Sequence, residues 1–190
     1  DGAKAEKWAM SVKGNVVVNA SGNDTGSGVG KNSSLTILGS YNGAGDDFCN
    51  NGSVYCRSGF KAKNLTNNGV MGGLNNFTSA EKTTNNGVIY SQYSLVDATN
   101  DVVNSQTGYI VCATINSYSG DFVNYGCAYA RENINCKGYA CSTASTSAWT
   151  YVGKTLNISG SSASADTYGL TYVNCCVTGN GRLNIRGGYF

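Results

Sequence analysis

Short apolar runs, separated by clusters of Gly, Asn and Ser, recur along this chain of 190 residues. Within the runs, apolar and polar positions tend to alternate, and Tyr, Val, Ile and Thr are frequent, which is typical of half-buried β-strands. The strand-like runs are 16–18, 35–38, 88–96, 109–115, 122–130, 148–152, 155–158, 168–173 and 182–185. The pattern predicts a mainly β fold with roughly nine to eleven short strands.

One helix is expected, at the start of the chain. Ala5, Trp8, Ala9 and Val12 recur at the spacing of a helical stripe, and Gly14 follows as a stop signal. The pattern therefore predicts one short N-terminal helix.

A short repeat appears in the first half of the chain. Asn-Asn-Gly occurs at 50–52, 67–69 and 85–87, so the copies start 17 and 18 residues apart, and a valine follows each one. Asn-Gly favours the positive φ angles of tight turns, so each copy predicts a corner between two strands. A near-constant period of this kind also occurs in β-solenoids.

These observations lead to a fold class and a domain division. We expect a disulfide-stapled antiparallel sheet, arranged as a sandwich or meander, with a β-solenoid as the less favoured alternative. Residues 1–20 are predicted to form a helix and strand arm, and residues 21–190 a single β-rich domain.

Cysteine usage predicts the compartment. The chain contains no histidine and eight cysteines, which are Cys49, Cys56, Cys112, Cys127, Cys136, Cys141, Cys175 and Cys176. An even count in a chain rich in Gly, Asn and Ser indicates a disulfide framework, and hence a secreted, extracellular or cell-surface protein. Local pairs (49 with 56, 136 with 141) and a link from 112 and 127 to 175 and 176 are candidates, among many other connectivities. Zinc is disfavoured, because no Cys-x-x-Cys occurs.

Catalysis is not expected. Without histidine, a serine or cysteine nucleophile lacks its usual base. The glutamates are Glu6, Glu81 and Glu132, and none lies in an apolar strand that would raise its pKa. We predict no enzyme, no cofactor and no metal site, and a carboxylate-dependent enzyme acting on polysaccharide is the third alternative. The acidic turns at 46–47 and 97–101 offer oxygen ligands for calcium, but a solvated turn is the favoured interpretation.

Charge and hydropathy exclude two classes of partner. Charged residues make up only 13% of the chain, the net charge is +2, and the basic residues are scattered. Such a chain lacks the basic patch that nucleic-acid binding requires. The apolar runs are far shorter than the roughly 20 residues that a membrane span needs.

Seven sequons of the form Asn-x-Ser/Thr are candidate glycosylation sites. They start at Asn19, Asn23, Asn32, Asn51, Asn64, Asn76 and Asn157. Use of any of them would make the chain a glycoprotein.

Proline is absent, so the chain does not use proline to protect the edges of its sheets. Both ends carry alternating strand patterns that suit insertion into a neighbouring sheet, at Val16, Val18, Leu183 and Ile185. Many tyrosines in the second half of the chain provide rigid contact surfaces. We therefore expect a structural subunit of a pilus-like extracellular filament or surface layer, with further copies of itself as partner.

The alternative is a monomeric carbohydrate-binding domain or adhesin for cell adhesion. In that case, aromatic side chains such as Trp149 and Tyr151 would contact glycans. Side chains of this kind serve both protein contacts and sugar contacts, so the sequence leaves both functions open.

Overall fold

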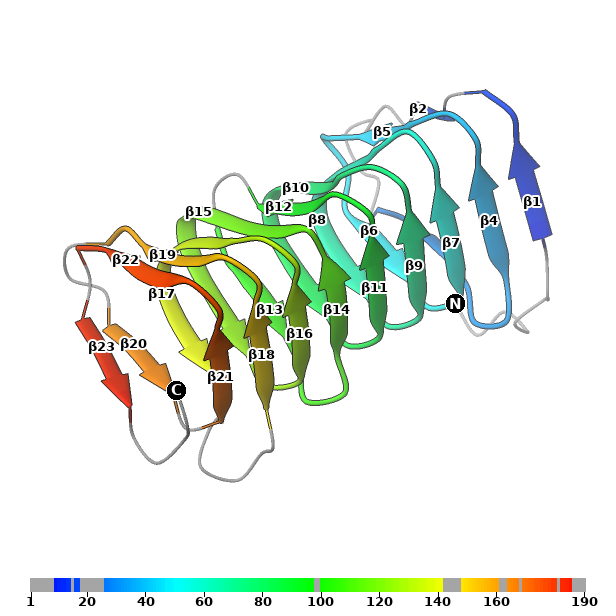
Figure 1. Ribbon diagram of the computed structural model, residues 1–190. Helices are drawn as coiled ribbons and strands as arrows, with labels where there is room; N and C mark the ends of the chain where they lie inside the picture. The colour runs from blue at the N-terminus through cyan, green and yellow to red at the C-terminus, as the bar shows by residue number, and fades with distance from the viewer. Residues whose placement is uncertain are drawn as a thin grey trace.

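In the computed structural model, the chain winds into a β-solenoid whose sheets are all parallel (Figure 1). The structure describes residues 9–14, 16–17, 26–97, 100–141, 148–160, 164–167, 169–180 and 182–185. These residues form 23 strands, and every strand pair among them is parallel. Each turn adds one strand to each of three flat sheets, which we call face 1, face 2 and face 3.

Face 1 consists of nine strands in the order of the chain. They are β1 (Ala9–Val12), β4 (Ser34–Ile37), β7 (Ser53–Cys56), β9 (Val70–Gly73), β11 (Val88–Ser91), β14 (Tyr109–Cys112), β16 (Cys127–Ala130), β18 (Trp149–Val152) and β21 (Leu170–Val173). In Figure 1 this sheet lies toward the viewer, with β1 at one end and β21 at the other.

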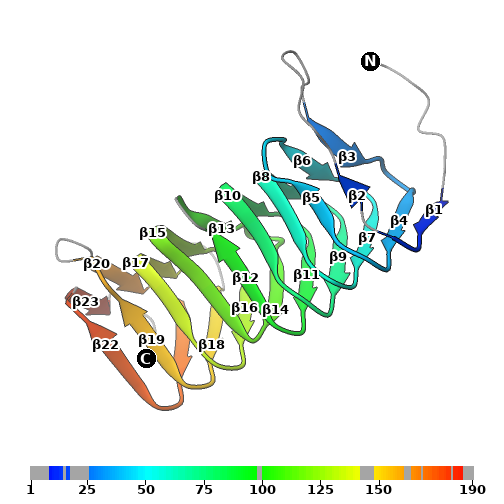
Figure 2. The same cartoon turned by 90° about the horizontal axis from the view of Figure 1, so that it is seen from above.

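Face 2 is seen best from above (Figure 2). It consists of β2 (Val16–Val17), β5 (Tyr41–Gly43), β8 (Phe60–Asn67), β10 (Phe77–Asn85), β12 (Ser94–Asp97), β15 (Thr114–Asn124), β17 (Ile134–Cys141), β19 (Thr155–Ile158) and β22 (Cys176–Gly179). The strands β8, β10, β15 and β17 are long enough to turn the next corner and continue into face 3. Register shifts inside two of these strands, between Ser79 and Lys82 and between Ser117 and Asp121, lie at this corner.

Face 3 is built from the second halves of those four long strands together with five short ones. The short strands are β3 (Ser27–Val29), β6 (Phe48–Asn50), β13 (Val102–Asn104), β20 (Ser164–Thr167) and β23 (Arg182–Ile185). After face 3 the chain turns through a corner rich in Asn and Gly and begins the next strand of face 1.

The expected sandwich or meander of antiparallel strands is wrong, and the less favoured solenoid is the observed fold. Alternating apolar and polar positions occur in half-buried strands of either kind, so alternation alone does not set strand direction. In this chain each strand returns to its own sheet only after crossing the other two faces, which makes neighbouring strands parallel.

The expected N-terminal helix is also wrong where the structure describes it. Ala9–Val12 form strand β1, and Met10 pairs in register with Leu35 of β4. The sheet edge of the next coil supplies hydrogen bonds that an isolated helical turn would have to make locally. Residues 1–8 lie outside the described part of the chain.

The core consists of side chains stacked in columns. Because successive strands are parallel and in register, the same inward position of each coil lies above that of the coil before. One column of face 1 runs through Leu35, Val54, Met71, Ile89 and Ile110, all of which are buried. Burying apolar area in this way is the main favourable term in folding.

A row of five buried asparagines lines the corner between face 3 and face 1. This inner asparagine row consists of Asn50, Asn67, Asn85, Asn104 and Asn124, each with 0% exposure. The first four side chains each donate from Nδ2 to the Oδ1 of the next asparagine at 2.8 Å, and Asn124 donates to Oγ1 of Thr150. Each Nδ2 also donates, at 3.0–3.2 Å, to the carbonyl of the residue that begins the face 1 strand of the following coil, as Asn50 does to Val70 at the start of β9. Buried amides are therefore paired along the whole row.

The Asn-Asn-Gly copies do form corners, but they lack the predicted positive φ angles. In the described residues, positive φ occurs only at Asn32, Gly26, Gly59 and Gly179. Glycine is required at Gly69 for another reason, because a Cβ there would overlap the carbonyl oxygen of Gly52 in the preceding coil. Stacked corners bring successive backbones into contact, so only glycine fits.

Candidate assembly surfaces

The outer surface of face 1 is uncharged and carries many large apolar and aromatic side chains. Its outward side chains, from β4 to β21, are Ser34, Thr36, Ser53, Tyr55, Val70, Gly72, Val88, Tyr90, Tyr109, Val111, Cys127, Tyr129, Trp149, Tyr151, Leu170 and Tyr172. Several of the largest are well exposed, including Tyr90 at 52% and Tyr172 at 51%. Large apolar side chains without a covering element mark an interaction surface.

The aromatic rings on face 1 stack on one another along the solenoid. The ring of Tyr151 lies 4.6 Å from that of Tyr129, with an interplanar angle of 7°, and 5.4 Å from that of Tyr172, with an angle of 8°. Trp149 stacks beside Tyr129 at 6.3 Å. The ring faces therefore contact neighbouring rings, and mainly ring edges point outward.

Faces 2 and 3 have different outer surfaces. Outward positions on face 2 are mostly polar and include Lys61 and Thr78. Further along the same face, Nδ2 of Asn135 donates to Oδ1 of Asn116 at 2.8 Å. Face 3 presents one row of small or medium side chains, such as Thr84 and Val123. The bulky aromatic surface is thus a property of face 1.

Charged side chains collect at the corners. Lys63 lies 3.8 Å from Glu81, and Lys154 lies 3.4 Å from Glu132. These pairs are exposed, so each contributes little to stability. The sequence analysis considered both glutamates for carboxylate catalysis and disfavoured them, and in the structure each has a basic neighbour at a solvent-exposed corner.

The acidic turns considered for calcium are bonded within the solenoid. Oδ2 of the buried Asp46 accepts a hydrogen bond from Oγ of Ser27, and Oδ1 of Asp47 accepts one from Nδ2 of Asn64 at 2.8 Å. Oδ1 of Asp101 accepts the backbone N–H of Asp121 at 2.9 Å. These carboxylates act as local structural acceptors.

The two ends of the solenoid present strand edges. No described strand pairs with the outer edges of β1, β2 and β3 at one end, or of β21, β22 and β23 at the other. The last inward side chain of a core column is also exposed at each end, because no further coil covers it. Met10 is 53% exposed although its register partner Leu35 is buried, and Val177 is 36% exposed although Leu156 beside it is buried.

The predicted assembly strands lie at these ends. Val16 belongs to β2, which pairs with β5, and Leu183 and Ile185 belong to β23, which pairs with β20. Val18 lies outside the described residues. Each of these strands therefore pairs on its inner edge within the chain, and insertion into another subunit stays a prediction.

The predicted disulfide framework is wrong, because no two of the eight cysteines, all of which are described, lie at disulfide-bonding distance. In a parallel stack, the close neighbours of a side chain are the residues at the same position of the adjacent coils. On one side of Cys112 this neighbour is Ala130, and for Cys127 the two neighbours are Tyr109 and Trp149. The candidate pairs lie in different columns, so the Cα separation that a bridge needs is not met.

The cysteines divide into an inner and an outer set. Cys56, Cys112, Cys136 and Cys141 are buried, whereas Cys49, Cys127, Cys175 and Cys176 are partly or fully exposed. Burial raises the pKa of the Cys56 thiol, and it raises the pKa of Cys136 to about 12. A hydrogen bond with Cys176 raises the pKa of Cys175. The inner thiols act as small apolar side chains of the core.

The structure separates the candidate glycosylation sites by exposure. Asn32, Asn51 and Asn76 are exposed at corners, while Asn64 and Asn157 are half-buried. Asn64 bonds to both Asp47 and Glu81. Asn19 and Asn23 lie outside the described residues. Glycosylation itself stays a prediction.

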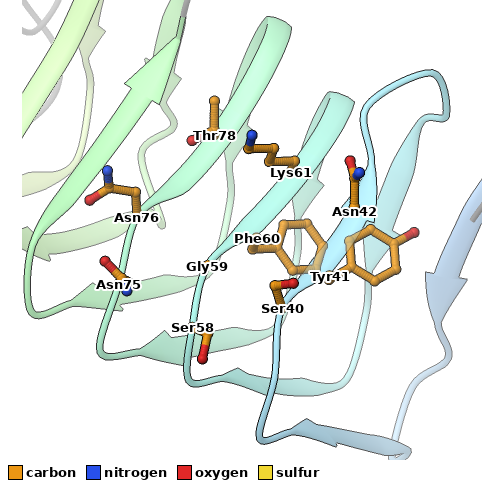
Figure 3. Close-up of a pocket in the computed structure, with 10 residues that line it drawn as sticks. All are labelled: Ser40, Tyr41, Asn42, Ser58, Gly59, Phe60, Lys61, Asn75, Asn76 and Thr78. Carbon is orange, nitrogen blue, oxygen red and sulfur yellow. The ribbon is translucent and has the colours of Figure 1, made fainter. Parts of the chain in front are cut away.

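A shallow groove of about 330 Å³ lies at the corner between faces 1 and 2 (Figure 3). Its rim carries polar side chains from three successive coils, among them Ser40, Ser58 and Asn75. The rings of Tyr41 and Phe60 stack at 4.4 Å and are both buried in the core. Because both rings are buried, a sugar in the groove could not stack on their faces.

No family model, curated protein or solved structure gives a significant match to the chain. Among the described residues, no helix has the length and apolarity needed to cross a bilayer. The function is therefore argued from the surfaces alone.

Proposed function

We propose that this chain is a structural subunit that polymerises head to tail, the C-terminal end of one solenoid stacking on the N-terminal end of the next. The supporting observation is that both ends expose inward columns and unpaired strand edges in the described residues. Open edges of this kind are a template for pairing with another chain.

The two ends are complementary in construction. Each of the three faces begins and ends with a strand, so β21 would pair with β1 of the next copy, β22 with β2 and β23 with β3. β1 and β21 each contain four residues, and continuing the register would place Val173 of one copy against Val12 of the next. The contact joins two different surfaces, so it does not close on itself and produces a filament.

A charge in the exposed inward column tests this proposal. Val177→Lys places an ammonium group where the next coil would stack, and Thr178→Lys places the same group one residue along on the outward side of the same strand. We expect filaments of the wild type and of Thr178→Lys in negative-stain micrographs, and monomers of Val177→Lys at the same concentration. Circular dichroism checks that both variants fold.

Two results would refute the proposal. One is a wild type that stays monodisperse at every concentration in light scattering. The other is equal loss of filaments in both lysine variants, since that would show a general charge effect. Secretion and an extracellular location stay predictions, and their main ground, the disulfide framework, is absent from the structure.

Glycan binding, the alternative function, receives less support. Sugars stack on the faces of aromatic rings, and on face 1 the ring of Tyr151 is already stacked between the rings of Tyr129 and Tyr172. We therefore favour a protein partner for this surface.

A further inference from the structure

The outer surface of face 1 is large enough to be an interface. Nine strands spaced by about 4.8 Å, with about 3.3 Å per residue along four residues, give a flat area of about 500 Å². Exposed apolar patches of this size mark interaction sites in soluble proteins. The surface lies along the solenoid axis, so it is separate from the ends that the proposed filament contact uses.

The surface has a gradient in side-chain size. At the N-terminal end, β4 and β7 present Ser34, Thr36, Ser53 and Tyr55, and β9 presents Val70 and Gly72. At the C-terminal end, β16, β18 and β21 present Cys127, Tyr129, Trp149, Tyr151, Leu170 and Tyr172. Small side chains thus predominate in one half of the surface, with Tyr55 as its one ring, and bulky side chains predominate in the other.

We propose that face 1 packs against face 1 of a second copy, about a two-fold axis that runs parallel to the strands and passes through β11. This rotation sets the two solenoids antiparallel, with β4 opposite β18, β7 opposite β16 and β9 opposite β14. Small positions then face bulky ones near the two ends of the contact, where Ser34 faces Trp149 and Thr36 faces Tyr151, which lets the two surfaces interdigitate there. Nearer the axis, Tyr109 faces Val70, while Tyr55 faces Tyr129 and Tyr90 faces its own copy, so rings meet rings at those two positions.

A second copy fits this surface better than other partners. Both surfaces repeat at the same strand spacing, so their rows of side chains stay in step along the whole contact, as in a steric zipper. The absence of charge on the outward side chains of face 1 means that no ion is desolvated when the two copies meet. A two-fold contact of this kind is self-complementary and closes as a pair.

The size of the contact predicts when pairing occurs. Two copies would bury about 1,000 Å² in total, which is typical of transient contacts between free subunits. Subunits already aligned in a filament would meet many such contacts at once, so pairing becomes strong by multivalency. Lateral pairing of filaments into bundles is the expected form.

A cross-linking experiment tests the antiparallel arrangement. The parent protein keeps Cys127 and carries Ser in place of the other outward cysteines, at positions 49, 175 and 176. Adding Ser53→Cys places a thiol opposite Cys127 of the second copy, so a short bismaleimide should yield a covalent dimer. The parent alone should not, because the two Cys127 residues lie four strands, or about 19 Å, apart along the axis.

A charge at the centre of the contact provides a second test. Tyr90 lies on the two-fold axis and would face Tyr90 of the other copy, so Tyr90→Lys brings two like charges together. We expect this variant to form single filaments without bundles and to lose the cross-link at least tenfold. Thr78→Lys, on the outward side of face 2, is the matched control and should leave both unchanged.

Several outcomes would overturn the pairing. Efficient cross-linking of the parent through Cys127 alone would show a parallel arrangement. Unchanged association of Tyr90→Lys, with no cross-link from Ser53→Cys, would remove face 1 as an interface. Binding of the monomer to insoluble cellulose or chitin, lost in Tyr90→Lys, would assign the surface to a glycan. Loss of filaments in Val177→Lys concerns the ends only, so the two proposals fail separately.

Discussion

Two rows of asparagine run side by side along one corner of the solenoid. The inner row includes Asn50, Asn67 and Asn85, and an outer asparagine row, one residue further along the chain, consists of Asn51, Asn68 and Asn86. In the outer row, Asn68 donates to Asn51 at 2.8 Å and Asn86 donates to Asn68 at 2.7 Å. The inner bonds measure 2.8 Å as well.

The two rows share residue type, spacing and bond length, and they differ in burial. An exposed amide that loses its partner bonds to water, whereas a buried amide that loses its partner carries the full cost of desolvation. The comparison therefore teaches that the inner row determines how the coils stack, while the outer row adds little. The same distinction separates the inner and outer cysteines.

The largest expected difference is in the reactivity of the thiols. At pH 8, a pKa of about 12 makes the thiolate fraction of Cys136 roughly a thousandfold smaller than that of a thiol with the ordinary value of 9.0. We expect N-ethylmaleimide to label Cys127 and Cys176 in the native protein and to leave Cys136 unlabelled, as mapped by mass spectrometry. In denaturant without reductant, every cysteine should react. Rapid labelling of native Cys136 would contradict the inner position.

The raised pKa also predicts a dependence of stability on pH. The folded state holds the Cys136 proton more tightly than the unfolded state, so its contribution is fully present below about pH 9. That contribution is lost as the pH rises toward about 12. Urea unfolding across this range should show the decrease, and Cys136→Ala should reduce the slope. An unchanged slope would assign the effect to other groups.

Removal of one inner amide is the next largest effect. Asn67→Ala removes the acceptor of Asn50 Nδ2 and one donor to the carbonyl of Val88, and it opens a cavity. We expect the free energy of unfolding to fall by about 3 kcal/mol. Urea denaturation followed by circular dichroism measures this loss. A decrease below about 1 kcal/mol would show that the row contributes far less than its burial implies.

Part of this architecture could be predicted from the sequence. The Asn-Asn-Gly copies at 50–52, 67–69 and 85–87 do mark successive corners, and their spacing is the length of one coil. Asn104 and Asn124 continue the inner row, but Ser105 and Tyr125 follow them instead of a second asparagine. The coils after Asn85 are longer than the earlier ones, so the period of 17 or 18 residues does not continue. Three copies of the repeat are too few to favour a solenoid over a sandwich.

The remaining features depend on which residues become neighbours in space. An even number of cysteines suggested bridges, but no two of the cysteines lie at bonding distance, and a count of cysteines does not say which of them share a column. Tyr129, Tyr151 and Tyr172 become one surface only when coils of 22 and 21 residues are stacked in register. The tyrosine-rich sequence predicted contact surfaces, but the stacking of the rings required the coordinates.

Gly69, beside the two rows, should show an intermediate effect. A Cβ at this position would overlap the carbonyl oxygen of Gly52, so Gly69→Ala pushes two successive corners apart. We expect a loss of about 2 kcal/mol in unfolding free energy. Gly72→Ala is the matched control, because a Cβ there meets only the ring of Tyr55 at 3.9 Å. Replacing Gly by Ala lowers the entropy of the unfolded chain in both variants alike, so equal losses would show that the overlap with Gly52 is not the cause.

The smallest effect is expected for the outer row. Asn68→Ala removes the hydrogen bonds to Asn51 and from Asn86, and water can replace both partners because Asn68 is exposed. We expect a change of about 0.5 kcal/mol or less, measured in the same urea titration as Asn67→Ala. The two substitutions delete the same side chain at adjacent residues, so intrinsic propensity largely cancels between them. A loss for Asn68→Ala as large as that for Asn67→Ala would mean that the amide ladder stabilises the solenoid wherever it lies, and that burial is not the deciding variable.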